Sequence, residues 1–156
     1  MQQKKKNNLI LIIDTDTQAL RQTGELLREL GDVIFATAAK AGQFMAYERK
    51  PDLILCAASL GDVSGVDMCK HFKSTRETKD AALVLLAERH DDQQELAALE
   101  AGAVDYIARP FNPQVLQARV RTHLALSRQQ NLLQLLADKD GLTEVYNRRH
   151  FENQAR

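Results

Sequence analysis

The stretch Leu9-Ile10-Leu11-Ile12-Ile13-Asp14-Thr15-Asp16 decides the fold class of this chain. Five consecutive apolar residues, three of them isoleucines, predict a strand that is buried on both faces, as in a parallel sheet. The polar residues that follow can start a helix, with Asp16 or Thr17 as its cap and Gly31 after its end. A buried strand followed by a capped helix is the first half of a βαβ unit.

The same alternation recurs along the next hundred residues or so. Short apolar runs predict four further strands, at 33–36, 53–56, 83–86 and 104–107. The helices between and after them are expected to begin at Thr37, at Ser64 with Asp67, at Asp91 with Asp92, and at Asn112 before Pro113. This pattern predicts an α/β fold, a five-stranded parallel doubly wound sheet whose ligand chemistry lies at the carboxyl ends of the strands.

The last predicted helix is longer than such a fold needs. No Gly or Pro interrupts the chain from just after Pro113 to about Ala137, which gives roughly 37 Å of helix. The stripe Leu116, Val120 and Leu124 is expected to dock on the sheet. Beyond it lie four leucines, Leu132, Leu133, Leu135 and Leu136. Either the same helix of a second copy or a following domain would cover them, and both readings remain open.

Composition excludes several classes of function. The 156 residues hold 21 Lys plus Arg and 21 Asp plus Glu, so net charge gives no case for nucleic acid or a membrane as partner. The run 9–13 is too short for a signal peptide or a membrane span. Cys56 and Cys69 are too few for a disulfide framework and are expected to be small buried side chains in a cytoplasmic protein.

The chain contains no GxGxxG, no GxxxxGK[ST] and no zinc-ligand spacing. What remains is a set of residues at the strand ends. The first strand is followed by Asp14, Thr15 and Asp16, and the fifth by Arg109 and Pro110. The third strand leads into Ala57 and Ser59, and the fourth into Ala87.

Four stretches together resemble a two-component response-regulator receiver domain, with its CheY-like, flavodoxin-like fold. They are Leu11 to Asp16, Pro51 to Ala57, Leu99 to Tyr106, and Arg109 to Phe111. The resemblance covers 9–127. It implies a domain that binds magnesium with acidic residues, accepts a phosphoryl group on an Asp ending the third strand, and reads it with a Ser/Thr and a Lys.

The chain departs from this family pattern at the residues that do the chemistry. Asp14 matches the first acidic position, but Thr15 stands where a direct magnesium ligand is expected. Ala57 takes the place of the phospho-accepting Asp, Ala87 that of the Ser/Thr, and Arg109 that of the Lys. A methyl group has no nucleophilic oxygen, so aspartyl phosphate cannot form at position 57. No cofactor is expected, and magnesium binding should be weak or absent.

Arg109 is expected to take over the place of the ion and the phosphate by pairing with Asp14 or Asp16, since a guanidinium can span two carboxylate oxygens. An alternative is that the vacated pocket uses Arg109 to bind a small ligand or an anion.

Three more residues complete the degenerate pocket that the resemblance implies. Ser59 can offer its backbone carbonyl, but one carbonyl does not make a magnesium site. Tyr106 sits where receivers keep an aromatic side chain that swings inward on activation; with no hydroxyl at Ala87, its rotamer is expected to be fixed. Pro110 matches a position that follows a cis peptide bond in the family.

The stretch Asp140-Gly141-Leu142-Thr143-Glu144-Val145-Tyr146-Asn147-Arg148-Arg149-His150-Phe151 resembles the opening of a diguanylate cyclase (GGDEF) domain, usually D-x-L-T-x-L-x-N-R-R-x-F. Val145 replaces a Leu, and the sequence stops at Arg156, before any Gly-Gly-Asp/Glu-Glu-Phe signature. The resemblance implies that the parent protein makes cyclic di-GMP, whereas this fragment is not itself an enzyme.

The expected organisation is a basic tail at 1–8, a degenerate receiver at 9–127, a helical linker at 128–139 and the start of a GGDEF domain at 140–156. The expected function is that of a phosphorylation-incompetent regulatory and dimerisation module. A homodimer suits this role because a cyclase that joins two GTP molecules needs two active sites face to face. Control would then come from a protein partner or from fixed dimerisation.

Overall fold

The structure is a computed structural model that describes residues 7–137. It has two units, one ending at Leu124 and one beginning at Ala125. The first is built on a five-stranded parallel sheet with the order β2-β1-β3-β6-β7. Its strands are β1 (Leu9–Ile13), β2 (Asp32–Ala36), β3 (Leu53–Ala57), β6 (Ala82–Ala87) and β7 (Asp105–Ala108). This strand order confirms the predicted doubly wound, flavodoxin-like fold.

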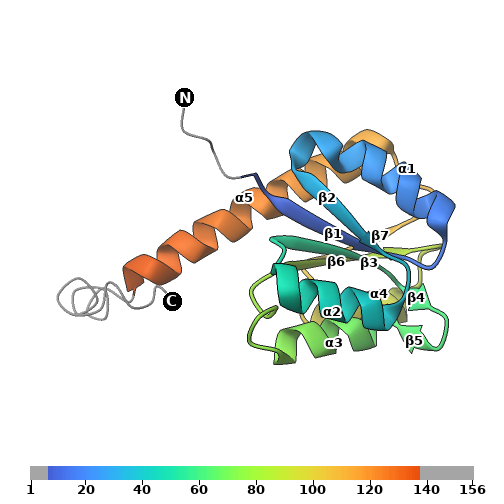
Figure 1. The fold of residues 1–156 in the computed structure, drawn as a ribbon. Helices are drawn as coiled ribbons and strands as arrows, with labels where there is room; N and C mark the ends of the chain where they lie inside the picture. Colours follow the sequence, from blue (N-terminus) through green and yellow to red (C-terminus); the bar gives the residue numbers. More distant parts are fainter. Residues whose placement is uncertain (1–6, 138–156) are drawn as a thin grey trace. The chain divides into compact units, whose positions relative to one another are not determined.

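Helices cover both faces of the sheet (Figure 1). They are α1 (Thr17–Leu27) with a 3-10 turn (Arg28–Leu30), α2 (Ala39–Arg49), α3 (Gly65–Ser74), α4 (Asp92–Glu100) and, within the first unit, residues 113–124 of α5 (Pro113–Ala137). Alternate residues of β1 enter two different cores: Ile10 and Ile12 pack on the side of α1 and α5, and Leu11 and Ile13 on the side of α2, α3 and α4. Burial on both sides explains why β1 is apolar throughout.

Most of the predicted helix starts are confirmed. Asp16, Ser64, Asp91 and Asn112 each accept hydrogen bonds from backbone N–H groups in the first turn of the helix that follows. The prediction for Thr37 is wrong. Helix α2 begins at Ala39, its N-cap is Ala38 in an extended conformation, and no side chain caps it. The chain continues for two residues after β2 before it turns, so Thr37 stands one position too early.

The loop expected after β3 instead holds two short antiparallel strands, β4 (Ser59–Leu60) and β5 (Val63–Ser64). Gly61 takes a φ of 78°, which favours glycine, in the turn between them. Leu60 is buried, and its packing into the core anchors the hairpin beside the end of β3. Sequence patterns missed this hairpin because two-residue strands have no detectable period.

Both cysteines are buried free thiols, as expected. Burial raises the pKa of Cys56 far above its usual range and that of Cys69 to about 11, so both thiols are protonated at neutral pH. Their reactivity as nucleophiles is correspondingly low.

The long helix is present. In the first unit, Leu116, Val120 and Leu124 of α5 are buried in the core, as predicted. In the second unit, Leu132, Leu133, Leu135 and Leu136 are between 52% and 63% exposed. Within residues 7–137, no helix has the length and apolarity needed to cross a membrane. The basic residues up to Lys6 and the GGDEF-like stretch at 140–156 lie outside the described residues.

Candidate functional site

The carboxyl ends of β1 and β3 bring several of the predicted site residues together. A pocket of about 460 Å³ opens there, which we call the mouth pocket. Its lining includes the predicted residues Asp14, Thr15, Asp16, Ala57 and Ser59. The parallel register explains this meeting, because Ile13 pairs with Cys56 and the next residues are Asp14 and Ala57.

Four of the predicted residues do not line the mouth pocket. Ala87 is buried at the end of β6. Tyr106, Arg109 and Pro110 belong to β7 and the segment after it. The pocket is instead completed by Glu88, which the sequence already placed at the end of the fourth strand, and by four residues that sequence reasoning missed: Arg89, His90, Asp91 and Gln94. The dense run of charges from Glu88 to Asp92, directly after a buried strand, was the signal that could have found them.

Three of the carboxylates that line the mouth pocket accept hydrogen bonds from the local backbone. Oδ1 of Asp14 accepts the N–H of Asp16 at 3.0 Å, while Asp16 and Asp91 cap α1 and α4. Burial raises the pKa of Asp14, and the hydrogen bond from Asp16 opposes that rise.

The expected pairing of Arg109 with Asp14 or Asp16 is wrong. Nε of Arg109 lies 3.6 Å from Oε2 of Glu88, and its guanidinium carbon lies 5.2 Å from the centre of the Phe111 ring. Asp14 and Asp16 are already engaged by backbone N–H groups, whereas Glu88 is free to turn and the Phe111 ring offers a cation–π contact. Nη2 of Arg109 is buried without a hydrogen-bond partner among the described residues.

Tyr106 points inward and is only 4% exposed. Its hydroxyl donates a hydrogen bond to Oε1 of Gln94 at 2.6 Å, and its ring meets that of His90 edge-on at 5.8 Å. The hydroxyl of Tyr106 is thus bonded to α4 in this structure, and a fixed rotamer stays a prediction. The Arg109–Pro110 peptide bond is cis, as the resemblance implied.

Asp14 and Asp16 of the mouth pocket belong to no group of three converging ligand side chains among the described residues. Magnesium needs several converging oxygen ligands. Among residues 7–137, the group of three ligand side chains that converges within 4.8 Å is His90, Asp92 and Glu95, which does not include Asp14 or Asp16. That group is an exposed ion-pair cluster, in which His90 lies 2.9 Å from Glu95 and 3.5 Å from Asp92. The hydrogen bond with Glu95 raises the pKa of His90.

An anion does not suit the mouth pocket. Four carboxylates line it, those of Asp14, Asp16, Glu88 and Asp91, and Arg109 is absent from the lining. The field there is therefore acidic, and the alternative expectation of an anion held by Arg109 at this place has no support.

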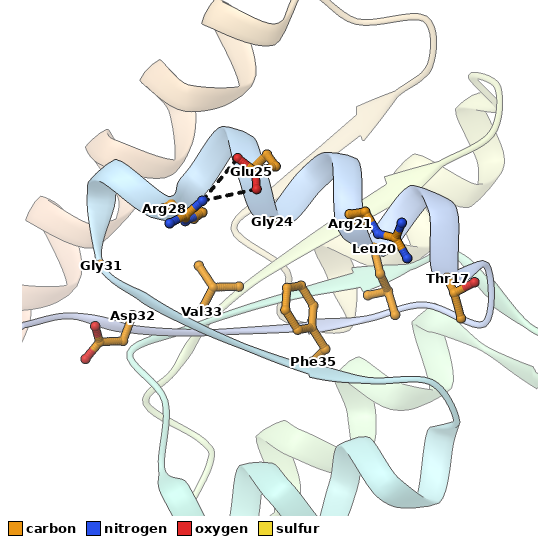
Figure 2. Close-up of a pocket in the computed structure, with 10 residues that line it drawn as sticks. All are labelled: Thr17, Leu20, Arg21, Gly24, Glu25, Arg28, Gly31, Asp32, Val33 and Phe35. Atoms are coloured by element: carbon orange, nitrogen blue, oxygen red, sulfur yellow. Dashed lines mark hydrogen bonds and ion pairs between the residues drawn. The ribbon is translucent and has the colours of Figure 1, made fainter.

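Two other hollows adjoin α1. One, of about 690 Å³, lies between α1 and the edge strand β2 and contains Leu20, Val33 and Phe35 (Figure 2). It holds none of the predicted site residues. The other, of about 660 Å³, lies between α1 and the segment from Arg109 to Pro113.

Comparison with known proteins now identifies the fold unit. The model of the response regulator receiver domain family matches residues 10–121. The chain belongs to this family. The receiver domain is 33% identical over 121 residues to the transcriptional regulatory protein YvrH of Bacillus subtilis, a match that covers 76% of this chain and 50% of that protein. It is 35% identical over 118 residues to the KDP operon transcriptional regulatory protein KdpE of Escherichia coli, covering 74% and 50%.

Solved structures of receiver domains and response regulators have the same fold as this chain. A putative response regulator from Chloroflexus aurantiacus is 32% identical with a TM-score of 0.72, covering 78% of this chain and 99% of that one. DrrB, an OmpR/PhoB homolog from Thermotoga maritima, is 33% identical with a TM-score of 0.67, covering 76% and 52%. The chain spans about half the length of the curated relatives it matches.

Proposed function

We propose that this receiver domain does not take up a phosphoryl group at the end of β3 and regulates through protein contacts instead. The observation that carries the proposal is the methyl group of Ala57, the last residue of β3, which lines the mouth pocket beside Asp14. Phosphoryl transfer to a receiver needs a carboxylate oxygen as nucleophile, and a methyl group cannot supply one.

Three other residues support this proposal, each for a separate step. Thr15 stands in the mouth pocket without the carboxylate that would help to hold magnesium. Ala87 ends β6 without a hydroxyl to follow a phosphoryl group. Arg109 pairs with Glu88 and not with the mouth residues Asp14 and Asp16. Weak or absent magnesium binding is part of the proposal.

Treatment with acetyl phosphate and magnesium, followed by intact-mass spectrometry, tests the proposal. The chain is expected to gain no phosphoryl group, while a receiver whose third strand ends in Asp gains one under the same conditions. Beryllofluoride should likewise leave the chain's amide NMR spectrum unchanged. An acid-stable, base-labile acyl phosphate on this chain would overturn the proposal.

We further propose that the second unit joins two copies of the chain. At 100° per residue, Leu132, Leu133, Leu135 and Leu136 occupy an arc of about 160° on α5, a broad apolar stripe. All four are more than half exposed. A parallel helix from a second copy would bury this stripe, as in a coiled coil. A following domain is the competing cover.

Analytical ultracentrifugation of the whole chain distinguishes burial of the leucines by a second copy from burial by a following domain. A dimer is expected, and replacing the four leucines by serine should give a monomer. Replacing Gln129 and Gln130 by serine is the matched control and should leave the dimer intact. A wild-type chain that stays monomeric over a wide concentration range contradicts the proposal, as does a leucine variant that remains dimeric.

We also propose that the parent protein is a cytoplasmic diguanylate cyclase that this module controls. The support is the GGDEF-like sequence from Asp140 to Phe151. The matched relatives YvrH and KdpE are named as transcriptional regulatory proteins, so a transcriptional output is the competing possibility. Incubating the parent protein with GTP and measuring cyclic di-GMP decides between them. Absence of product from a folded parent that binds DNA would refute the cyclase proposal.

A further inference from the structure

The hollow between α1 and the segment from Arg109 to Pro113, which we call the side cavity, differs in character from the mouth pocket. Its volume of about 660 Å³ is within the range of small-molecule sites. Leu26, Pro110, Phe111 and Pro113 give it a largely apolar wall. Arg109 lines this cavity although it does not line the mouth pocket.

The charged residues of the side cavity leave an excess of positive charge. They are Arg21, Glu25 and Arg109. Glu25 is engaged by Arg28, whose Nη1 lies 3.1 Å from Oε2 of Glu25 (Figure 2). Arg21 makes no ion pair within residues 7–137. The carboxylate paired with Arg109 belongs to Glu88, which is 83% exposed and 3.6 Å away. A pair of this kind contributes little and is readily exchanged.

The position of Arg109 makes it a receptor for a carboxylate. Its guanidinium is packed over the Phe111 ring, and its side chain is 25% exposed. Nη2 is buried without an acceptor among the described residues. A buried N–H without a partner is costly, so a small turn of the guanidinium toward an incoming oxygen pair would satisfy it. Guanidinium groups bind carboxylates with two parallel hydrogen bonds.

We propose that the side cavity binds a small organic acid, a carboxylate attached to an apolar ring. The carboxylate is held by Arg109 with help from the charge of Arg21, and the ring lies against Leu26, Phe111 and Pro113. A bare phosphate would leave the apolar wall uncovered, and a neutral ring would leave Nη2 of Arg109 without an acceptor and the charge of Arg21 without a counter-charge. This site is independent of the proposed lack of phosphorylation, because phosphate on the chain would overturn that proposal without affecting this cavity.

Titration of the isotope-labelled whole chain with benzoate, followed by NMR, tests the site. Benzoate is expected to bind saturably, with shifts at the Arg109 side-chain N–H and at amides of Leu26 and Phe111. Benzamide, which has the same ring without the charge, and inorganic phosphate should each bind at least about tenfold more weakly, the loss expected for a missing charged hydrogen bond or a missing apolar surface.

Variants assign the binding to Arg109. Arg109→Gln should weaken benzoate binding at least about tenfold. Arg109→Lys keeps the positive charge but loses the two parallel hydrogen bonds of the guanidinium, so its affinity for benzoate should lie between those of the wild type and Arg109→Gln. Arg119→Gln is the matched control, because Arg119 is paired with Asp105 and does not line the cavity. The amide spectrum of each variant reports whether it is folded. The proposal fails if benzoate does not bind, if benzamide or phosphate binds equally well, or if folded Arg109→Gln and Arg109→Lys both keep full affinity.

Discussion

The hydroxyl of Tyr106 donates a hydrogen bond to Oε1 of Gln94 across 2.6 Å, and this bond ties β7 to α4. Helix α4 has few other anchors, since Ala98 is its one buried residue. The edge-on contact of Tyr106 with His90 holds the segment before α4 against the same ring. The aromatic side chain therefore fastens the wall of the mouth pocket that carries His90, Asp91 and Gln94.

Breaking this bond should loosen α4 by a measurable amount. Gln94→Leu is expected to lower the free energy of unfolding by about 0.5–1.5 kcal/mol, and Tyr106→Phe by a similar amount. Because both remove the same hydrogen bond, the double variant should lose less than the sum of the two. Urea denaturation measures all three. Gln93→Leu, at the exposed neighbouring position, is the control, and strict additivity would argue against the bond.

The buried carboxyl of Asp14 should make stability depend on pH. Burial raises its pKa, so the fold favours the protonated form; this contribution is complete below the ordinary value of 3.8 and is lost as the pH rises through the raised pKa. Asp14→Asn should therefore stabilise the protein at pH 7, raising the thermal midpoint by about 2–4 °C, as about 1 kcal/mol does in a chain of this length.

The gain from Asp14→Asn should shrink as the pH approaches 4, which thermal unfolding at both pH values will show. Asp62→Asn, in the exposed turn between β4 and β5, serves as the control for removing a negative charge. A gain that is independent of pH would mean that burial of the charge is not its cause.

Restoring an acid at the end of β3 should be unfavourable in this pocket. Ala57→Asp places a second carboxylate next in register to Asp14 on the adjacent strand. At an effective dielectric near 20, like charges about 4 Å apart repel by about 4 kcal/mol, so a loss of about 1–4 kcal/mol at pH 7 is expected. Ala57→Asn adds a side chain of nearly the same volume as Asp but without the charge, so it should lower the free energy of unfolding by less than Ala57→Asp does. Equal losses in urea denaturation would show that volume, not charge, is responsible.

The start of α3 is packed directly against the end of β3. A Cβ on Gly65 would lie 2.6 Å from the carbonyl oxygen of Ala57 and 2.9 Å from Cα of Ala58. Backbone atoms cannot move aside cheaply, so Gly65→Ala should lower the free energy of unfolding by about 1–3 kcal/mol. Gly24→Ala is the contrast: its Cβ would meet the end of the Phe35 ring, which is 44% exposed and free to turn.

Gly24→Ala should therefore change the free energy of unfolding by less than about 1 kcal/mol. The higher helix propensity of alanine stabilises α1 and offsets the cost of moving the Phe35 ring. Thermal and urea unfolding of the two variants provide the comparison. A larger loss for Gly24→Ala than for Gly65→Ala would contradict this account of the two contacts.

The local signals of the sequence predicted most of the fold. Continuous apolar runs predicted the strands that are buried on both faces. The helix starts were predicted from capping side chains, because a cap depends on atoms within three residues; these side chains are Asp16, Ser64, Asp91 and Asn112. The start at Thr37 failed because no side chain caps α2. The β4–β5 hairpin escaped because its pairing is too short to leave a pattern.

The sequence by itself determined the side-chain chemistry at the ends of the strands, because the methyl side chains of Ala57 and Ala87 carry no oxygen in any surroundings. Only the tertiary structure decided which groups meet. Arg109 pairs with Glu88 and packs on Phe111, while Asp14 and Asp16 accept backbone hydrogen bonds instead. Tyr106 donates its hydroxyl hydrogen bond to Gln94. Covalent chemistry belongs to single residues, whereas the choice of partner is a competition among groups that only folding brings together.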